Sequence, residues 1–224
     1  MRVLELYPFG NGLGQAFTAR GHHVVVVDFK SRKDWRADLI VTPENLAAFA
    51  KEIRRGSFDL VLARPFCTTY SPASRFMHYR DAFTGRPLTP VAREADALVR
   101  AELAVIRRVN PRYGWVLENP HGTLRKCAFM ADIPVITVTL CQYGHPVRKA
   151  TDLFGLIPEA FKPRACAVGD DCHIHSNWKR KSGRVFGDAL RKTFHSPFLR
   201  ATLPYKLSFD LCRAFETLNG RVKT

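Results

Sequence analysis

Short apolar runs of strand type alternate along the chain with longer stretches that repeat apolar residues at helical spacing. The runs expected to form strands cover residues 3–7, 23–27, 35–42, 59–63, 113–118 and 133–140. The stretches expected to form helices cover residues 15–20, 43–55 and 90–109, with Thr42 and Thr89 as N-caps of the last two. On the longest helix, the apolar face comprises Ala95, Val99, Leu103 and Ile106. Strands that alternate with helices predict an α/β domain.

The ends of two predicted strands carry reactive side chains. Cys67 follows strand 59–63 in a loop with Arg64 and several hydroxyl residues, where nearby positive charge favours thiolate over thiol. Glu118 ends strand 113–118. Because ligands bind outside the carboxyl ends of strands in open α/β sheets, we expect both side chains to face one pocket. At this point a buried structural cysteine and a capping glutamate remain alternatives.

A glycine-rich turn follows the first predicted strand. It covers residues 9–14 and leads directly into helix 15–20, and Asp28 ends the next strand. An acidic residue at that place is suited to bind ribose hydroxyls. The strand, turn, helix and acid together predict a nucleotide-type cofactor at the first turn.

Composition bounds the size of the protein and the kind of partner. The 224 residues, 46% of them apolar, can form one core, so we expect one domain with a small appendage. Six irregularly spaced cysteines do not make a disulfide framework, and no apolar run is long enough to span a bilayer. The net charge of +15, which leans toward the C-terminus, indicates a polyanionic partner, with nucleic acid as the first candidate.

Together these motifs resemble the DNA (cytosine-5) methyltransferase family, in particular its short phage-type members. The resembling segments, in family order, are residues 5–14, Pro65-Phe66-Cys67, Glu118-Asn119-Pro120 and residues 142–149. The resemblance implies a Rossmann-like S-adenosylmethionine-dependent methyltransferase fold with a small basic C-terminal appendage. Its parts would be a catalytic domain at 1–155, a DNA-recognition segment at 156–199, and a segment at 200–224 that returns to the catalytic domain.

The resemblance also implies site roles. Cys67 would attack C6 of cytosine, Glu118 would protonate or hydrogen-bond N3, and Arg148 or Lys149 would orient the base or its phosphate. The donor would be S-adenosylmethionine or a modified analogue, bound by Tyr7, Phe9, Gly10, Asn11, Gly12, Asp28, Asp38, Pro65 and Asn119. Phe9 and Asn11 stand where the family usually has glycine. We therefore expect altered donor handling at the methionine end of the pocket.

The candidate DNA contacts lie in two places. They are Arg75 and Arg80 in the loop 72–88, and Lys179, Arg180, Lys181 and Arg184 in the appendage. The appendage also gathers Cys166, Cys172 and His175, with His195 as a candidate fourth ligand. This set predicts either a small zinc site, although its Cys-x5-Cys spacing is wider than usual, or a basic DNA-contact loop without metal.

Two other functions are compatible with these motifs. One is a cytosine-5 methyltransferase that acts on RNA, and the other is a DNA-binding homologue with weakened catalysis. Phe9 favours the second alternative, whereas the presence of both Cys67 and Glu118 speaks against it. We expect a soluble monomer in the cytoplasm of a bacterium or of a phage-infected host cell.

Overall fold

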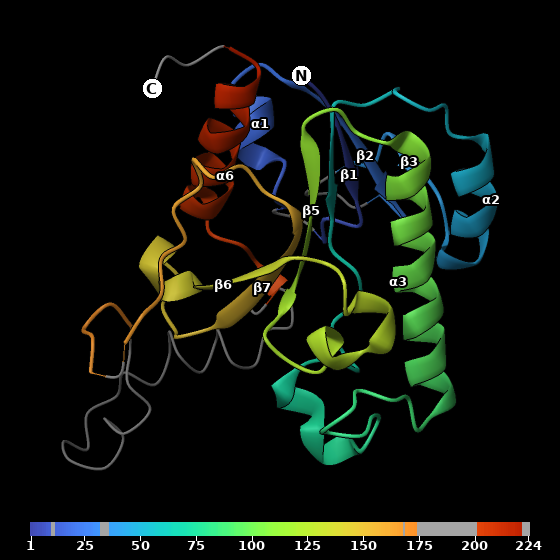
Figure 1. Ribbon diagram of the computed structural model, residues 1–224, viewed down its shortest axis with the longest axis vertical. Coiled ribbons are helices and arrows are strands. Elements are labelled where there is room, and N and C mark those ends of the chain that lie inside the picture. Colours follow the sequence, from blue (N-terminus) through green and yellow to red (C-terminus); the bar gives the residue numbers. More distant parts are fainter. Residues whose placement is uncertain (10–11, 32–35, 168, 174–200, 221–224) are drawn as a thin grey trace.

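The protein is built around one twisted sheet. The computed structural model describes residues 1–9, 12–31, 36–167, 169–173 and 201–220. In these residues the strands are β1 (Arg2–Leu6), β2 (His23–Asp28), β3 (Leu39–Ile40), β4 (Leu60–Ala63), β5 (Gly114–Pro120), β6 (Val135–Thr139) and β7 (Ala150–Leu156). Their order is β3-β2-β1-β4-β5-β7-β6 (Figure 1).

Strand direction identifies the fold class. β1 to β5 pair in parallel, whereas β7 runs antiparallel to both β5 and β6. This order, with one reversed strand next to the edge, is the arrangement of the Rossmann-like S-adenosylmethionine-dependent methyltransferase fold. The predicted fold class is therefore confirmed.

Helices cover both faces of the sheet. They are α1 (Gln15–Ala19), α2 (Leu46–Glu52), α3 (Pro90–Val109) and α6 (Tyr205–Leu218), with 3-10 turns η1 (Pro43–Asn45), η2 (Pro72–Met77), η3 (Leu124–Lys126), η4 (Ala128–Met130) and η5 (Leu140–Tyr143). In Figure 1, α2 and α3 lie on one side of the sheet, and the blue α1 lies beside the red α6 on the other. None of the described helices is long and apolar enough to cross a membrane.

The core consists of two layers, because successive residues of a strand point to opposite faces of the sheet. In β4, Leu60 and Leu62 pack in the layer with α1 and α6, whereas Val61 and Ala63 pack in the layer with α2 and α3. All four side chains are fully buried. β4 is therefore a central strand whose carboxyl end is held rigidly.

The prediction from sequence missed one strand and misjudged one helix. The sequence does not predict β7, because Thr151 and Asp152 near its start are polar even though both are fully buried. The predicted helix 43–55 is a 3-10 turn followed by α2, and the Thr42 side chain does not cap it. The Thr89 cap is confirmed, since its side chain accepts a hydrogen bond from the Ala92 backbone N–H.

Glu102 is a buried acid of α3 with an unusual environment. It is fully buried, and neither carboxylate oxygen has a hydrogen-bond partner among the described residues. Burial raises the pKa of Glu102 well above its ordinary value, which favours the protonated side chain in the folded protein.

We predict that Glu102 makes the protein less stable as pH rises. The folded state keeps a proton that the unfolded state loses above about pH 4.3, so the free energy of unfolding falls by up to about 1.4 kcal/mol per pH unit from this group. In Glu102→Gln this contribution is absent. The free energy of unfolding, measured with urea between pH 5 and 8, should therefore depend less on pH in this variant than in the unmodified protein. The control is Glu94→Gln, an exposed position of the same helix. An unchanged slope in Glu102→Gln would contradict the prediction.

Candidate active site

The candidate site lies where the strand order reverses. Connections from β1 lead outward to β2 and β3 on one side, and those after β4 lead to β5 on the other. The carboxyl ends of β1 and β4 therefore face a crevice of the kind in which α/β sheets bind ligands. The turn after β1 and the loop with Cys67 after β4 both begin at this edge.

The turn after β1 wraps around the carboxylate of Glu5. The Gly14 N–H donates to Glu5 Oε1 at 2.8 Å. A Cβ atom at Gly12 would lie 2.0 Å from Oε1, and one at Gly14 would lie 2.4 Å from Oε2, so a side chain at either position would displace the Glu5 carboxylate. Burial raises the pKa of Glu5 to about 6. Gly10 and Asn11, both predicted to bind the donor, lie outside the described residues.

Phe9 occupies a backbone conformation that suits glycine. Its φ is 52°, in the left-handed region that bulky residues rarely adopt. Its ring packs on Phe66, with centroids 4.8 Å apart, and on Phe29 at 6.1 Å, while the Tyr7 ring stacks on Phe66. These four side chains form an aromatic cluster that joins the first turn, the end of β2 and the nucleophile loop.

The two predicted acids stand at neighbouring strand ends. Asp28, at the end of β2, is fully buried, and its Oδ1 accepts a hydrogen bond from the Phe29 N–H at 2.7 Å. Asp38 lies just before β3 and is exposed, and its Oδ2 accepts from the Val26 N–H at 2.8 Å. Asp28 thus lies at the carboxyl end of β2, whereas Asp38 lies level with Val26 at the start of β3, and each carboxylate also holds backbone in place.

The loop after β4 presents Cys67 to solvent. The Cys67 carbonyl accepts hydrogen bonds from the N–H groups of Tyr70 and Ser71, which closes the loop into a tight turn. Asn119 is fully buried, and its Nδ2 donates to the Pro65 carbonyl at 3.1 Å. The two predicted donor contacts, Pro65 and Asn119, therefore bind each other and fix the cysteine loop to β5.

Glu118 and Arg64 form a buried ion pair beneath this loop. Arg64 Nε donates to Glu118 Oε2 at 3.0 Å, and both side chains are almost completely buried. The Arg64 guanidinium also donates to the carbonyls of Pro8 and Ala201. Glu118 Oε1 is buried and accepts no hydrogen bond from the described residues. The sequence did not indicate this role of Arg64, since the partner carbonyls are distant in the chain.

Lys149 joins Cys67 and Glu118 at the site because β7 runs antiparallel to β5. Pro120 pairs with Thr151, so the start of β7 meets the carboxyl end of β5. Burial lowers the pKa of Lys149, while the charges of Glu118 and Cys67 oppose that shift. Arg148 is exposed instead and donates to the Cys166 carbonyl at 3.3 Å. Of the two predicted cations, only Lys149 interacts with Cys67 and Glu118.

The thiol of Cys67 is not activated in the ligand-free protein. Loss of surrounding water raises its pKa, the Glu118 carboxylate adds to the increase, and Lys149 and Arg64 oppose it. Positive charge from Lys149 and Arg64 does favour the thiolate, as predicted, but desolvation and the Glu118 carboxylate outweigh it. These are the two causes that the sequence prediction omits.

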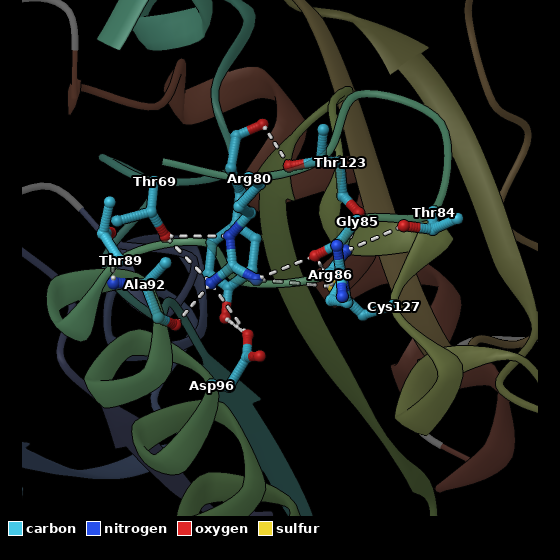
Figure 2. Close-up of polar contacts among 11 residues, drawn as sticks. Thr69, Arg80, Thr84, Gly85, Arg86, Thr89, Ala92, Asp96, Thr123 and Cys127 are labelled. Carbon is cyan, nitrogen blue, oxygen red and sulfur yellow. Dashed lines mark hydrogen bonds and ion pairs between the residues drawn. The ribbon is translucent and has the colours of Figure 1, made fainter. Parts of the chain in front are cut away.

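Arg80 is a structural residue and not a DNA contact, which corrects the prediction (Figure 2). Its side chain is buried, forms an ion pair with Asp96 at 2.8 Å, and donates to Thr69 Oγ1 and to the carbonyls of Gly85 and Ala92. Arg80 thus ties the segment 72–88 to α3 and to the nucleophile loop.

The remaining predicted residues fall in three groups. Arg75 is exposed on η2, as a DNA contact requires. Cys166 is buried and Cys172 is partly exposed. The others lie outside the described residues: His175, Lys179, Arg180, Lys181, Arg184 and His195.

Comparison with known proteins gives structural likeness but no sequence match. No protein-family model and no curated protein matches the chain. Solved structures that resemble it include an Escherichia coli prophage-encoded protein assigned as a DNA modification methyltransferase, with 15% identity over 75% of this chain and 52% of that one, at a TM-score of 0.46. The Dnmt2 methyltransferase of Schizosaccharomyces pombe has 15% identity over 69% of this chain and 48% of that one, at a TM-score of 0.40. The methyltransferase EhMeth of Entamoeba histolytica has 10% identity over 75% of this chain and 57% of that one, at a TM-score of 0.42. The chain spans about half the length of each of these proteins.

We predict that the pH dependence of Cys67 alkylation reflects the charges of Glu118 and Lys149. The rate of carboxamidomethylation by iodoacetamide, measured on the Cys67 peptide, should rise with pH to a midpoint above the ordinary thiol value of 9.0. Glu118→Gln should lower the midpoint because it removes a negative charge. Lys149→Met should raise it because it removes a positive charge.

Arg148→Met is the matched control, since that side chain lies against Cys166 instead. It should leave the midpoint unchanged. Shifts of the opposite sign in the Glu118 and Lys149 variants, or equal midpoints in all four proteins, would contradict the described site.

Proposed function

We propose that the protein transfers a methyl group, or a related one-carbon group, from S-adenosylmethionine or an analogue to C5 of cytosine in DNA. The reaction would proceed through a covalent bond between Cys67 and C6. One observation carries the proposal: Cys67 interacts with Glu118 and Lys149 at one edge of the sheet, and Glu118 Oε1 is buried there without a hydrogen-bond partner among the described residues. A buried acceptor of this kind is suited to bind a polar ligand group.

The proposed chemistry divides between these side chains. Cytosine C5 is a poor nucleophile until a thiolate adds to C6. Sulfur of Cys67 forms a bond to C6 while Glu118 supplies a proton to N3, which makes C5 electron-rich and able to accept a methyl group. Loss of the C5 proton to water then breaks the bond between sulfur and C6. N3 returns its proton to Glu118, and Cys67 leaves as a thiolate.

The charges of the site couple these two roles. The Glu118 carboxylate raises the pKa of Cys67, so a proton on Glu118 makes the thiolate easier to form. Lys149 favours the thiolate by direct attraction. Arg64 occupies Glu118 Oε2, which leaves Oε1 as the oxygen available to the base. Cysteine ionisation and glutamate protonation thus favour each other, and the proposed reaction uses that combination.

The residues around the first turn fit a donor of this class. When bound, S-adenosylmethionine supplies an electrophilic methyl group on a sulfonium. Asp28, at the carboxyl end of β2, would bind its ribose, and Asp38, just before β3, would bind its adenine. Gly12 belongs to the turn after β1. The aromatic cluster would lie at the methionine end of the donor. The Phe9 side chain would leave less space for the methionine part of the donor than a glycine at this position.

We predict that Phe9 weakens binding of the ordinary donor. Phe9→Gly removes a ring from the proposed donor site and places glycine at a left-handed φ. The affinity for S-adenosylmethionine, measured by calorimetry, should rise by about tenfold, which corresponds to about 1.4 kcal/mol. The control is Phe83→Gly, an exposed position outside the cluster. Tight binding by the unmodified protein, unchanged in Phe9→Gly, would exclude altered donor handling.

We predict that DNA with 5-fluorocytosine at the target position traps the protein. Elimination requires loss of a proton from C5, and fluorine cannot leave as a proton, so the adduct should survive denaturation. Glu118→Gln should slow its formation by about 10² to 10⁴-fold, the scale for a lost general acid. Cys67→Ser should abolish it, because a hydroxyl is far less ionised than a thiol.

The trap distinguishes the proposal from its alternatives. Peptide mapping must place the adduct on Cys67, and Cys127→Ser, a buried cysteine of another region, is the control that should keep it. An adduct formed with RNA but not DNA would indicate an RNA enzyme. Full turnover by Cys67→Ser would refute covalent catalysis by this residue.

Charge supports DNA as the partner, and we predict a steep salt dependence of duplex binding. At a net charge of +15, the logarithm of affinity should fall linearly with the logarithm of salt concentration. Alanine at Lys179, Arg180 and Lys181 should flatten the slope by about 0.9 for each phosphate that these side chains neutralise. Alanine at Lys51, Arg54 and Arg55 is the control, because these exposed residues precede the amino end of β4. Equal effects of both triple changes would place the DNA surface elsewhere.

A further inference from the structure

A cluster of three cysteines and one histidine lies beside the β6–β7 hairpin. Cys141 belongs to η5, directly after β6, and Cys166, Cys172 and His173 come from the chain after β7. The three Sγ atoms and one histidine ring nitrogen all lie within 4.8 Å of one another. Segments that are 24 or more residues apart in the sequence therefore place four metal-ligand atoms at one point.

The separations between these atoms match the edges of a tetrahedron around zinc. Cys172 Sγ lies 3.6 Å from Cys141 Sγ and 3.4 Å from Cys166 Sγ, and His173 Nδ1 lies 3.4 Å from the sulfur atoms of both Cys166 and Cys172. Zinc bonds of about 2.3 Å to sulfur and about 2.0 Å to nitrogen give tetrahedral edges of roughly 3.5–3.8 Å. A disulfide would need sulfur atoms about 2.05 Å apart.

Hydrogen bonds around the cluster hold its loop in place. The Cys166 N–H donates to Thr139 Oγ1 at 2.6 Å. Gln142 Nε2 contacts Cys172 Sγ at 3.4 Å, and Asp170 Oδ2 accepts from the Ala167 N–H at 2.9 Å. Such outer contacts orient ligands in metal sites. The backbone is thus arranged to keep the sulfur atoms converged.

We infer that Cys141, Cys166, Cys172 and His173 bind one structural Zn²⁺ ion. Three thiolates and one imidazole form a closed four-ligand set, which is typical of structural and not catalytic zinc. The inference corrects the ligand set expected from sequence: Cys141 joins it, and His173 supplies the nitrogen that was assigned to His175. It is independent of the proposed reaction, because none of the four ligands is assigned a catalytic role.

A second group of candidate ligands serves as a contrast. His22, Cys212 and Glu216 also converge. Glu216, however, accepts two hydrogen bonds from Arg20, and His22 contacts both Glu216 and the N-terminal amine. An arginine at the centre of the group repels a cation, so this cluster is a buried ion-pair network that ties α6 to α1.

The zinc site would support the geometry of Lys149. Arg148 donates to the carbonyl of the ligand Cys166. The N–H of Leu140, the residue before the ligand Cys141, donates to the Lys149 carbonyl at 2.9 Å. The metal would also fix the chain at His173, directly before the basic residues 179–184 of the sequence. A structural ion here therefore joins the hairpin to the start of the basic segment.

The test is metal content together with cobalt spectroscopy. Protein purified under reducing conditions, or refolded with Zn²⁺ alone, should hold one equivalent of zinc. Co²⁺ in its place should give the intense visible bands of a tetrahedral thiolate site. Cys141→Ser and His173→Ala should lose most of the zinc, whereas the matched controls Cys212→Ser and His175→Ala should keep it.

A thiol-blocking reagent provides the readout that does not depend on folding of a variant. On the unmodified protein the reagent should release one equivalent of zinc. Until the zinc is released, Cys141, Cys166 and Cys172 should react with the reagent more slowly than they do in metal-free protein. Metal-free protein with no cobalt bands, a disulfide between Cys166 and Cys172 under reducing conditions, or zinc loss in His175→Ala but not in His173→Ala would overturn the inference.

Discussion

The ion pair between Arg64 and Glu118 constrains the rest of the site. Burial of two charges costs several kcal/mol for each ion and is offset only when the remaining donors and acceptors are satisfied. Arg64 meets this condition through the carbonyls of Pro8 and Ala201 as well as Glu118. The pair therefore joins the turn after β1, the end of β5 and the chain that enters α6. Removal of either partner would leave a buried charge at the point where these segments meet.

This pair also determines which atoms remain available for chemistry. Because Arg64 holds one oxygen of Glu118, the other oxygen stays buried without a hydrogen-bond partner among the described residues, and the carboxylate acts on Cys67 and Lys149 through its charge. The environment of Cys67 favours the thiol, since partial desolvation by the surrounding protein and the Glu118 carboxylate both raise its pKa. Protonation of Glu118, which the proposed reaction requires, would remove the second of these causes.

Local sequence patterns were sufficient to predict the strands that carry Cys67 and Glu118, because β4 and β5 are apolar runs that end in a turn or an acid. They were insufficient for β7, whose buried Asp152 is satisfied by Arg125 and His121 from distant parts of the chain. Lys149 could not be distinguished from Arg148 without the antiparallel pairing of β7. Arg80 was misassigned for a similar reason, since the partners that define its role are brought together only by the fold. The sequence pointed to His175 as a candidate ligand, whereas the fold brings His173 to the cysteine cluster.

The proposed function requires that Cys67 acts on cytosine in DNA. Mass spectrometry of nucleosides from the DNA of cells that express the protein tests this requirement, with cells that express Cys67→Ser at equal level as the reference. We expect a C5-substituted deoxycytidine in the first sample and none in the second. Unmodified deoxycytidine in both samples, or the same modified nucleoside in both, would contradict it.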